Sequence, residues 1–191
     1  MTRRDEIVDA ALRLFAERGY AATTIVAIEE AAGFTPGAGG LYRHVRSKRE
    51  LLDLALERTL TTRRAAQTDP ALSEGDLRTA VTAAAHGALA TFDADRDLYR
   101  LLLRGGDLPI DLDDTYDRLF QPGFDEVAAW LAHLAGDRPG LDAAAVASVA
   151  LSSLCYVVVS ELAYGRPPGG VDRERFVAAW VDGLVRQLEE P

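Results

Sequence analysis

Residues 23–52 read TTIVAIEEAAGFTPGAGGLYRHVRSKRELL, and their helix signals decide the fold class. A short helix is expected to begin after Thr23 or Thr24, because a threonine hydroxyl can cap a helix N-terminus, and to end at Gly33. Residues 47–50, SKRE, form a capping box that opens a longer helix. The stretch between these two signals is short, which predicts closely spaced helices joined by tight turns.

That intervening stretch, GFTPGAGGLYRHV at residues 33–45, is rich in glycine. Thr35 and Pro36 provide a helix start, a cap followed by proline at the first helical position. Three glycines within positions 37–40 oppose a helix, since each costs about 1 kcal/mol relative to alanine. One interpretation is a third helix that begins after Thr35 and trades rigidity for close approach to a partner. The alternative is a loose turn before a helix that starts at Gly40.

The sequence on both sides also predicts helices. Ahead of this stretch, Thr2 and Asp5 form a capping-box pattern, and Gly19 ends the helix that follows. Beyond Arg64, the polar stretch AAQTDPALSEGD at residues 65–76 indicates a connection between two modules. No clean period-two alternation is present. Five further helices are expected at residues 77–92, 95–104, 113–134, 142–164 and 172–189.

The predicted fold is therefore all-α, with a three-helix N-terminal domain at residues 1–47 and a helical bundle at residues 48–191. Three short helices closed by Gly19 and Gly33 have the spacing of a helix-turn-helix, in which one helix crosses the DNA backbone and the next enters the major groove. Residues 143–160 are nearly uncharged. We expect this run to be a buried helix of a soluble bundle rather than a membrane span.

Charge is distributed unevenly along the chain. The 191 residues carry a net charge of −9, but residues 1–64 hold eleven Lys or Arg against nine Asp or Glu, a net +2. Residues 65–191 hold ten against twenty-one, a net −11. Only the first third therefore tolerates a polyanion such as DNA. One cysteine, no metal-ligand spacing and no apolar leader predict a cytoplasmic protein without a cofactor, and the lack of catalytic motifs argues against an enzyme.

The stretch at residues 23–52, together with IVDAALRLFAERGYAATT ahead of it, resembles the TetR family of one-component transcriptional regulators. The resemblance implies a homodimer whose two helix-turn-helix heads bind a palindromic double-stranded DNA operator, and a small-molecule inducer bound in the C-terminal domain. The heads must lie about one helical turn, ~34 to 36 Å, or a multiple of it apart to reach one face of the duplex. A repressor is the expected role. An activator, and a family member with weakened sequence-specific binding, stay open as alternatives.

The resemblance also implies which residues contact DNA, position by position. The implied contacts are Thr24, Tyr42, His44 and Lys48 on the phosphate backbone, and Arg3 and Arg4 along the minor groove. Thr24 and Lys48 lie at helix N-termini, where the helix dipole favours an anion. Two alternatives stay open: a packed aromatic ring for Tyr42 and a solvated surface charge for Lys48.

The glycine-rich stretch is longer than is usual in the family, by about two residues, and offers few side chains for base contacts. Small side chains let the backbone approach the groove wall and leave its amides free for phosphates, while the Ala38 methyl can meet a thymine methyl. Direct base contacts then fall to Thr35 and Arg43, with Arg46 as a further candidate, and groove shape supplies part of the specificity. The remaining members of the predicted DNA-binding set are Pro36 and Gly37.

The C-terminal bundle is expected to bind the effector in a pocket lined by apolar and aromatic groups with a few polar ones. The candidates are His86, Phe92, Tyr99, Leu102, Tyr116, Phe120, Phe124, Trp130, Cys155 and Tyr156. The dimer is expected to form through the last two helices, where small residues permit close approach. Its candidates are Ala147, Ala150, Leu151, Leu154, Val158, Phe176, Trp180 and Leu184. Packing within one chain is the alternative for both sets.

Overall fold

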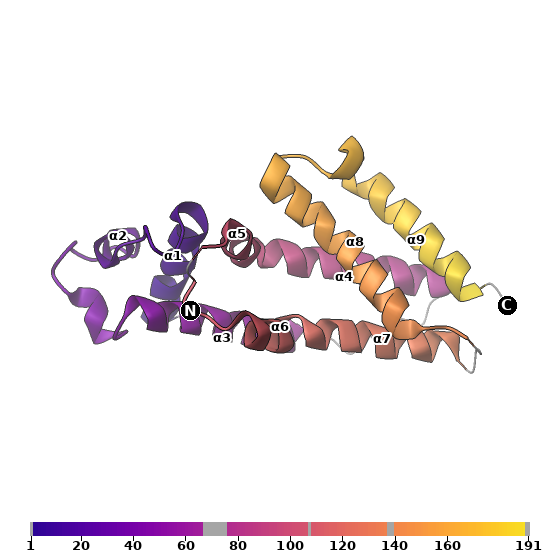
Figure 1. Ribbon diagram of the computed structural model, residues 1–191, viewed down its shortest axis with the longest axis horizontal. Helices are drawn as coiled ribbons and strands as arrows, with labels where there is room; N and C mark the ends of the chain where they lie inside the picture. The colour runs from indigo at the N-terminus through magenta and orange to yellow at the C-terminus, as the bar shows by residue number, and fades with distance from the viewer. Residues whose placement is uncertain (1, 67–75, 107, 137–139, 190–191) are drawn as a thin grey trace. The chain divides into compact units, whose positions relative to one another are not determined.

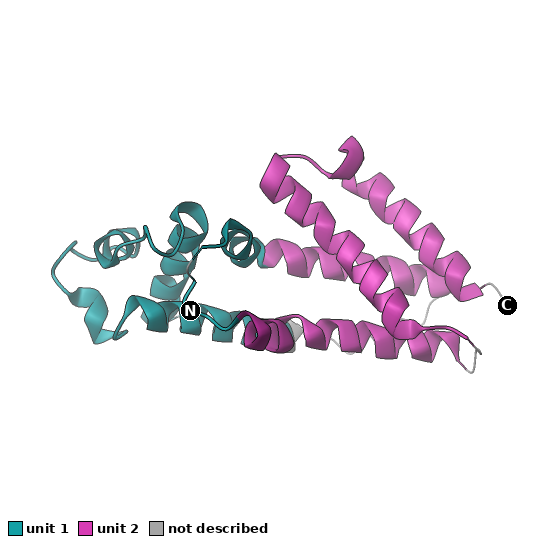
Figure 2. Cartoon of the chain, in the orientation of Figure 1, with its two compact units in different colours: residues 1–64, 95–111 teal, residues 65–94, 112–191 magenta. Residues whose placement is uncertain are grey.

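The computed structural model describes residues 2–66, 76–106, 108–136 and 140–189, and the regular structure in these ranges is helical. The chain forms two compact units, coloured separately in Figure 2. Unit 1 comprises residues 1–64 and 95–111, and unit 2 comprises residues 65–94 and 112–191. The predicted all-α fold is confirmed. Most of the predicted connection at residues 65–76 lies outside the described residues.

Each unit is built from several helices, labelled in Figure 1. The helices of unit 1 are α1 (Arg3–Arg18), α2 (Ile25–Ala31), the 3-10 helix η1 (Gly40–Arg43), α3 (Lys48–Ala66, all but its last two residues) and α5 (Arg96–Arg104). Those of unit 2 are α4 (Leu77–Ala94), α6 (Leu112–Leu119), α7 (Gln121–Ala135), α8 (Ala143–Tyr164), the 3-10 helix η2 (Pro168–Gly170) and α9 (Arg173–Glu189).

Local capping signals set the ends of the first two helices. Thr2 Oγ1 accepts the Asp5 N–H at 3.3 Å, and the Thr2 N–H donates to Asp5 Oδ2 at 2.6 Å, which is the predicted capping box. The Thr2 backbone N–H, followed by the Thr2 hydroxyl, holds the pKa of the Asp5 carboxyl below its usual value. Helix α1 ends at Gly19 and Thr24 caps α2, both as predicted.

The core of unit 1 gathers side chains from α1, α2, η1, α3 and α5. Its fully buried members include Ile7, Phe15, Ile28, Leu41, Leu51, Leu52 and Leu101. The predicted boundary after residue 47 places α5 in the C-terminal domain, yet α5 packs against α1 and buries Leu98 and Leu101. The compact units therefore differ from the predicted domains. An amphipathic helix lies where apolar surface needs covering, whatever its place in the sequence.

Unit 2 is a bundle in which α8 contacts α4, α7 and α9, while α4 also packs along α9 (Figure 1). Its core includes Val81, Leu131, Leu154, Val157, Val181 and Val185. The apolar stripes of these helices face one another, as the helical periodicity of the sequence predicts.

The single helix predicted at residues 113–134 is wrong. Two helices, α6 and α7, occupy this stretch and are separated at Phe120, with Pro122 in the first turn of α7. Proline lacks the backbone N–H that a helix interior needs, and its ring clashes with the preceding turn. A proline is tolerated in the first turn of a helix but not in its interior, so α6 ends and a new helix, α7, begins just before Pro122.

Helix α8 is the described helix that is long and apolar enough to cross a membrane, with a mean hydropathy of 2.0 over its most apolar window. A core helix of a soluble protein passes the same test of length and composition. In the structure Ala147, Leu154 and Val158 are buried, and α8 contacts three neighbouring helices. One side of α8 is therefore packed in the bundle as expected, although only 39% of its most apolar window is buried.

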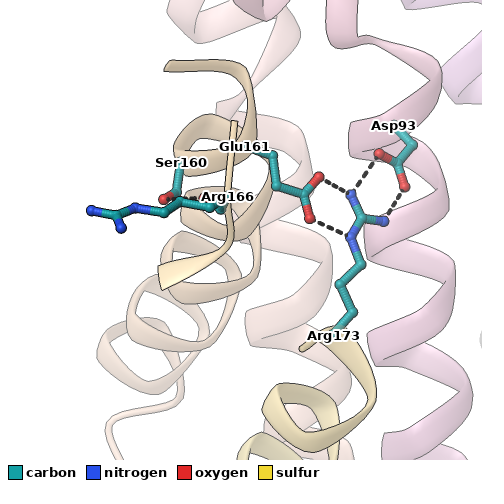
Figure 3. A network of polar contacts seen from close by, with 5 residues as sticks. All are labelled: Asp93, Ser160, Glu161, Arg166 and Arg173. Atoms are coloured by element: carbon teal, nitrogen blue, oxygen red, sulfur yellow. Dashed lines mark hydrogen bonds and ion pairs between the residues drawn. The ribbon is translucent and has the colours of Figure 1, made fainter. Parts of the chain in front are cut away.

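Arg173 joins three helices of unit 2 at the start of α9 (Figure 3). Its Nη1 and Nη2 donate to Asp93 in α4 at 2.5 and 2.9 Å, and its Nε and Nη2 donate to Glu161 in α8 at 2.8 and 2.7 Å. The hydrogen bonds to Asp93, then those to Glu161, raise the pKa of Arg173 above its ordinary value. Beside this cluster, Ser160 Oγ donates to the Arg166 carbonyl at 2.8 Å. Together these contacts hold the end of α4 to the connection between α8 and α9.

Replacing Arg173 with methionine is expected to lower the free energy of unfolding by about 1–2 kcal/mol, because two carboxylates lose a charge-assisted partner in a site that is only partly buried. Urea denaturation at pH 7 measures the change. The control Arg173→Lys keeps the charge but not the planar fork, and should recover only part of the loss. Equal stability of Arg173→Met and the wild type would contradict the expectation.

Candidate nucleic-acid interface

The exposed N-terminus of α2 carries the first candidate, Thr24. Its Oγ1 accepts the Ala27 N–H at 3.2 Å, and because a hydroxyl both accepts and donates, its proton stays available for a further acceptor such as a phosphate oxygen. The neighbouring Thr23 is buried, and its Oγ1 donates to the carbonyls of Leu14 and Gly19 at 3.1 and 2.8 Å. Thr23 thus ties the start of α2 to the end of α1.

No helix begins after Thr35. A turn occupies this stretch, closed by the Ala38 N–H donating to the Thr35 carbonyl at 3.2 Å, and η1 follows as a single turn of 3-10 helix. Gly37 and Gly39 have φ angles of 75° and 70°, in the left-handed region that an α-helix does not use. The predicted third helix from Thr35 is therefore wrong. The alternative, a turn before a helix at Gly40, describes the structure.

A buried carboxylate lies beneath this turn. Glu29 in α2 is 1% exposed, and its Oε2 and Oε1 accept the N–H groups of Gly37 at 2.7 Å and Leu41 at 3.4 Å. The expectation that the loop amides are free for phosphates is wrong at Gly37 and at Ala38, whose N–H donates to the Thr35 carbonyl. Glu29 is absent from the predicted site residues, although the sequence held a signal: it shares the apolar face of α2 with Ile25 and Ile28, where an acid is unusual.

The side chains of η1 and the residues after it divide between the core and the solvent. Leu41 and Val45 are buried, whereas Tyr42 is 56% exposed and Arg43 and His44 are exposed. The exposed ring of Tyr42 excludes the alternative of a packed aromatic. Helical geometry accounts for the division, because residues four apart lie on the same face and those between them point elsewhere.

Residues 35–46 are named the cationic segment here, because they include Arg43 and Arg46 and contain no Asp or Glu. Both arginine side chains are exposed, and no hydrogen bond or ion pair joins either one to the described part of the chain. The other exposed members that were predicted to contact DNA are Thr35, Pro36, Gly37 and Ala38. The segment therefore presents two arginine side chains without an ion-pair partner among the described residues, which favours the approach of a polyanion.

Lys48, at the first position of α3, has a structural role. Its Nζ donates to the carbonyls of Tyr20 at 2.9 Å, Ala21 at 3.4 Å and Thr23 at 3.0 Å, and lies 4.4 Å from the centre of the Tyr20 ring. Because an ammonium has three donors, all of them are used within unit 1. Lys48 is thus not the solvated charge of the alternative interpretation, and the predicted phosphate contact requires it to leave these carbonyls.

The two N-terminal arginines are also engaged within unit 1. Arg3 donates to Glu6 and to the Ala32 carbonyl, each at 2.6 Å, and its guanidinium lies 4.4 Å from the centre of the Phe34 ring. Arg4 forms an exposed ion pair with Glu50 at 3.2 Å. Since an exposed pair of this kind contributes little, Arg4 can exchange its partner for a phosphate at low cost, whereas Arg3 cannot.

The predicted effector-site residues are divided between the two units. Tyr99 and Leu102 lie on α5 in unit 1, where Tyr99 is buried. In unit 2, Phe92 and Trp130 pack against the core, Phe120, Phe124 and Cys155 are partly buried, and His86, Tyr116 and Tyr156 are exposed. The Tyr116 and Phe120 ring centres are 6.0 Å apart. A pocket formed by all ten residues stays a prediction.

Most of the predicted dimer residues are buried within unit 2. The buried members are Ala147, Ala150, Leu154, Val158 and Leu184, while Leu151, Phe176 and Trp180 are partly exposed. Trp180 Nε1 donates to the Ala150 carbonyl and to Ser153 Oγ, both at 3.1 Å. Ala147, Ala150, Leu154 and Val158 lie on a side of α8 that packs within unit 2, and Leu184 of α9 is buried in the same unit. The dimer set as a whole stays a prediction.

A different side of α8 is open to solvent. Its exposed residues are Ala145, Val149, Ser152 and Tyr156, which follow one another at helical spacing and are named the exposed face of α8 here. Val149 is 73% exposed and Tyr156 is 51% exposed. The exposed face of α8 thus carries two large side chains, Val149 and Tyr156, on one stripe of the helix.

In unit 1, helix α2 with its exposed N-terminus and the exposed cationic segment that follows it form an arrangement of the helix-turn-helix kind. Residues 7–55 match the model of the bacterial regulatory proteins of the tetR family. The resemblance predicted from the sequence is thus confirmed over residues 7–55, about a quarter of the chain.

The HTH-type transcriptional repressor KstR2 of Rhodococcus jostii (strain RHA1) is 49% identical to this chain over 51 residues. That match covers 27% of this chain and 24% of KstR2, so the chain aligns with about a quarter of the length of this curated relative. The family and its relatives are regulators of transcription and not enzymes, in agreement with the prediction.

Solved structures resemble the whole chain. A TetR-like transcriptional regulator from Rhodococcus sp. RHA1 has a TM-score of 0.68 at 20% identity, covering 99% of this chain and 97% of the other. The fatty acid degradation regulator FadR from Bacillus halodurans has a TM-score of 0.68 at 18% identity, covering 100% and 98%. At these identities the likeness establishes the fold of the full chain, including the bundle that the sequence match does not reach.

Proposed function

We propose that this protein is a transcriptional repressor that binds operator DNA as a homodimer and is released by a small-molecule effector. The observation that carries the proposal is the cationic segment, which exposes Tyr42, Arg43 and Arg46 without a neighbouring acid in the segment. It lies next in the chain to α2, whose N-terminus offers Thr24. The rest of the chain is acidic, which orients a polyanion toward this surface. The KstR2 relative is named as a repressor, which supports that sign of regulation.

The homodimer is proposed to form through the exposed face of α8. Val149 and Tyr156 are apolar side chains open to solvent, and Ser152 between them is small enough for a second helix to approach closely. A two-fold contact places the same stripe on both chains, so each copy covers the other. The dimer gives two heads a fixed separation, and a palindromic operator matches that symmetry.

The effector is proposed to bind in unit 2, where the aromatic side chains Phe92, Phe120, Phe124 and Trp130 are partly buried and supply apolar surface. A ligand that changes the separation of the two heads weakens both sets of DNA contacts together. The protein is then cytoplasmic, where both DNA and metabolites are accessible.

A gel-shift experiment with the DNA upstream of the protein's own coding region tests the proposal. At two salt concentrations, a specific regulator should retain a sharp complex as salt rises, whereas binding to phosphates alone should collapse. Loss of the complex at the higher salt would favour the alternative of weakened sequence-specific binding. A transcription assay on the same DNA separates a repressor from an activator.

Arg43→Ala is expected to weaken operator binding by roughly tenfold, because an exposed arginine in the groove contacts guanine or a phosphate. Stability should not change, since the side chain is exposed. Fluorescence anisotropy with a labelled operator measures the affinity. The matched control is Arg175→Ala, which removes an exposed arginine from unit 2 and should leave the affinity unaltered. Equal affinity of Arg43→Ala and the wild type would remove Arg43 from the interface.

A further inference from the structure

An acidic side chain is unexpected in the interior directly beneath a surface that is proposed to bind a polyanion. Glu29 is 1% exposed, and acids are rarely buried this deeply unless they are paired. In the described part of the chain its hydrogen-bond partners are two backbone amides, Gly37 and Leu41. Its negative charge opposes the approach of phosphates. Electrostatic attraction to DNA therefore does not explain why a glutamate occupies this position.

The two amides bracket the glycine-rich part of the cationic segment. Between Gly37 and Leu41 lie Ala38, Gly39 and Gly40, and glycines gain more conformational freedom than other residues when released. The N–H groups of Gly39 and Gly40 donate no hydrogen bond within the described residues. The Glu29 carboxylate accepts hydrogen bonds from both ends of this stretch, at Gly37 and Leu41. It thus fixes a conformation that the glycines between them do not determine by themselves.

Packing supports the same conformation from one side. A Cβ atom added to Gly40 would lie 2.9 Å from Phe34 Cδ1, so the backbone of this stretch rests directly on the Phe34 ring. Leu41 is fully buried. The orientation of the next two residues, Tyr42 and Arg43, therefore depends on the hydrogen bond between the Leu41 amide and Glu29.

We propose that Glu29 is a positioning residue for DNA recognition, whose carboxylate holds the segment from Gly37 to Leu41 in the conformation that presents Ala38 and Arg43 to base edges. The proposal rests on the proposed function as a DNA-binding regulator. Each carboxylate oxygen accepts one of two amides, and glutamate is the side chain of this length that offers two acceptors. The longer glycine-rich stretch thereby gains a defined shape from a residue in the preceding helix.

The test variant is Glu29→Gln, which keeps the size of the side chain but replaces one acceptor by a donor, so that only one amide can be held. Affinity is measured for the operator and for DNA of unrelated sequence. We expect the ratio of the two affinities to fall by roughly tenfold, because base contacts depend on the geometry of the segment. Affinity for unrelated DNA and its salt dependence should not fall, since the phosphate contacts remain. The control Glu30→Gln removes the same charge from an exposed neighbour and should preserve the ratio.

If Glu29 acted only through its charge, Glu29→Gln would bind all DNA more tightly with an unchanged ratio, and that result would overturn the proposal. A second measurement on the wild type applies even where the variant fails to fold. Amide hydrogen exchange by NMR should be slower at Gly37 and Leu41 than at Gly39 and Gly40. Equal rates at all four amides would overturn the proposal as well.

Failure of the proposed function is distinguishable from failure of this inference. Suppose that the wild-type protein forms no specific complex with any operator, yet has slow exchange at Gly37 and Leu41. That result would contradict the proposed function as a DNA-binding regulator, while the hydrogen bonds from these two amides to Glu29 would stand. If the wild type binds its operator specifically and Glu29→Gln has the same ratio of affinities, the positioning role of Glu29 would be contradicted and the proposed function would stand.

Discussion

Replacement of Lys48 by methionine is expected to lower the free energy of unfolding by about 2–3 kcal/mol. The variant removes the ammonium that donates to the carbonyls of Tyr20, Ala21 and Thr23, and the Tyr20 carbonyl keeps the Thr23 N–H as a donor. It also removes a cation from the face of the Tyr20 ring. Methionine has nearly the same length, so the packing of the aliphatic stem is retained. The loss is then that of the ammonium alone. Thermal and urea denaturation of the full chain measure it.

The same variant separates the structural role from the phosphate contact implied by the family resemblance. If Lys48 binds a phosphate, the slope of log affinity against log salt decreases by about one in Lys48→Met. Under conditions in which Lys48→Met stays folded, we expect this slope to equal that of the wild type. The matched control is Arg49→Met: Arg49 is the next residue in α3 and forms an exposed pair with Asp53, so its loss should cost at most about 0.5 kcal/mol. Equal stability of the two variants would contradict the assigned role.

Introduction of aspartate at both Val149 and Tyr156 is expected to produce a monomer and to weaken operator binding at least about a hundredfold. Four like charges would face one another in a two-fold contact, in place of apolar side chains. A single head then has to bind half an operator alone and loses the effective concentration that a tethered second head supplies. The effect on operator binding is therefore much larger than for a single contact residue such as Arg43.

Analytical ultracentrifugation reports the oligomeric state, and fluorescence anisotropy reports the operator affinity. Both substituted side chains are exposed in the single chain, so its folding should be little affected, and circular dichroism checks this. The control is Leu112→Asp, which places one charge at an apolar side chain 63% exposed in α6 and should leave the dimer intact. A Val149→Asp, Tyr156→Asp protein that stays dimeric would rule out the exposed face of α8 as the interface.

Signals that act over a few residues were legible in the sequence. The capping box of Thr2 and Asp5, the cap at Thr24 and the helix end at Gly19 were all predicted and are present. Such features depend on hydrogen bonds between residues within one turn, so the local sequence suffices. The helix break at Pro122 belongs to the same class and was equally legible, although the prediction missed it.

The family resemblance carried the prediction further than periodicity could. It pointed to the tetR-type match at residues 7–55 and to the function proposed above, because the helix-turn-helix stretch is specific in sequence. The bundle offers no such pattern, since many combinations of apolar residues fill a helical core equally well. Its likeness to solved TetR-like structures is one of fold, at 20% sequence identity.

By itself, then, the sequence determined the all-α class, most helix ends and the charge asymmetry that favours DNA at the N-terminal domain. Only the tertiary structure decided the partners of Glu29, Lys48 and Leu101, and which side of α8 faces solvent. The physical reason is distance along the chain. The Lys48 ammonium meets carbonyls more than twenty residues earlier, and Leu101 joins a core built mostly from the first 55 residues, so packing alone brings these groups together.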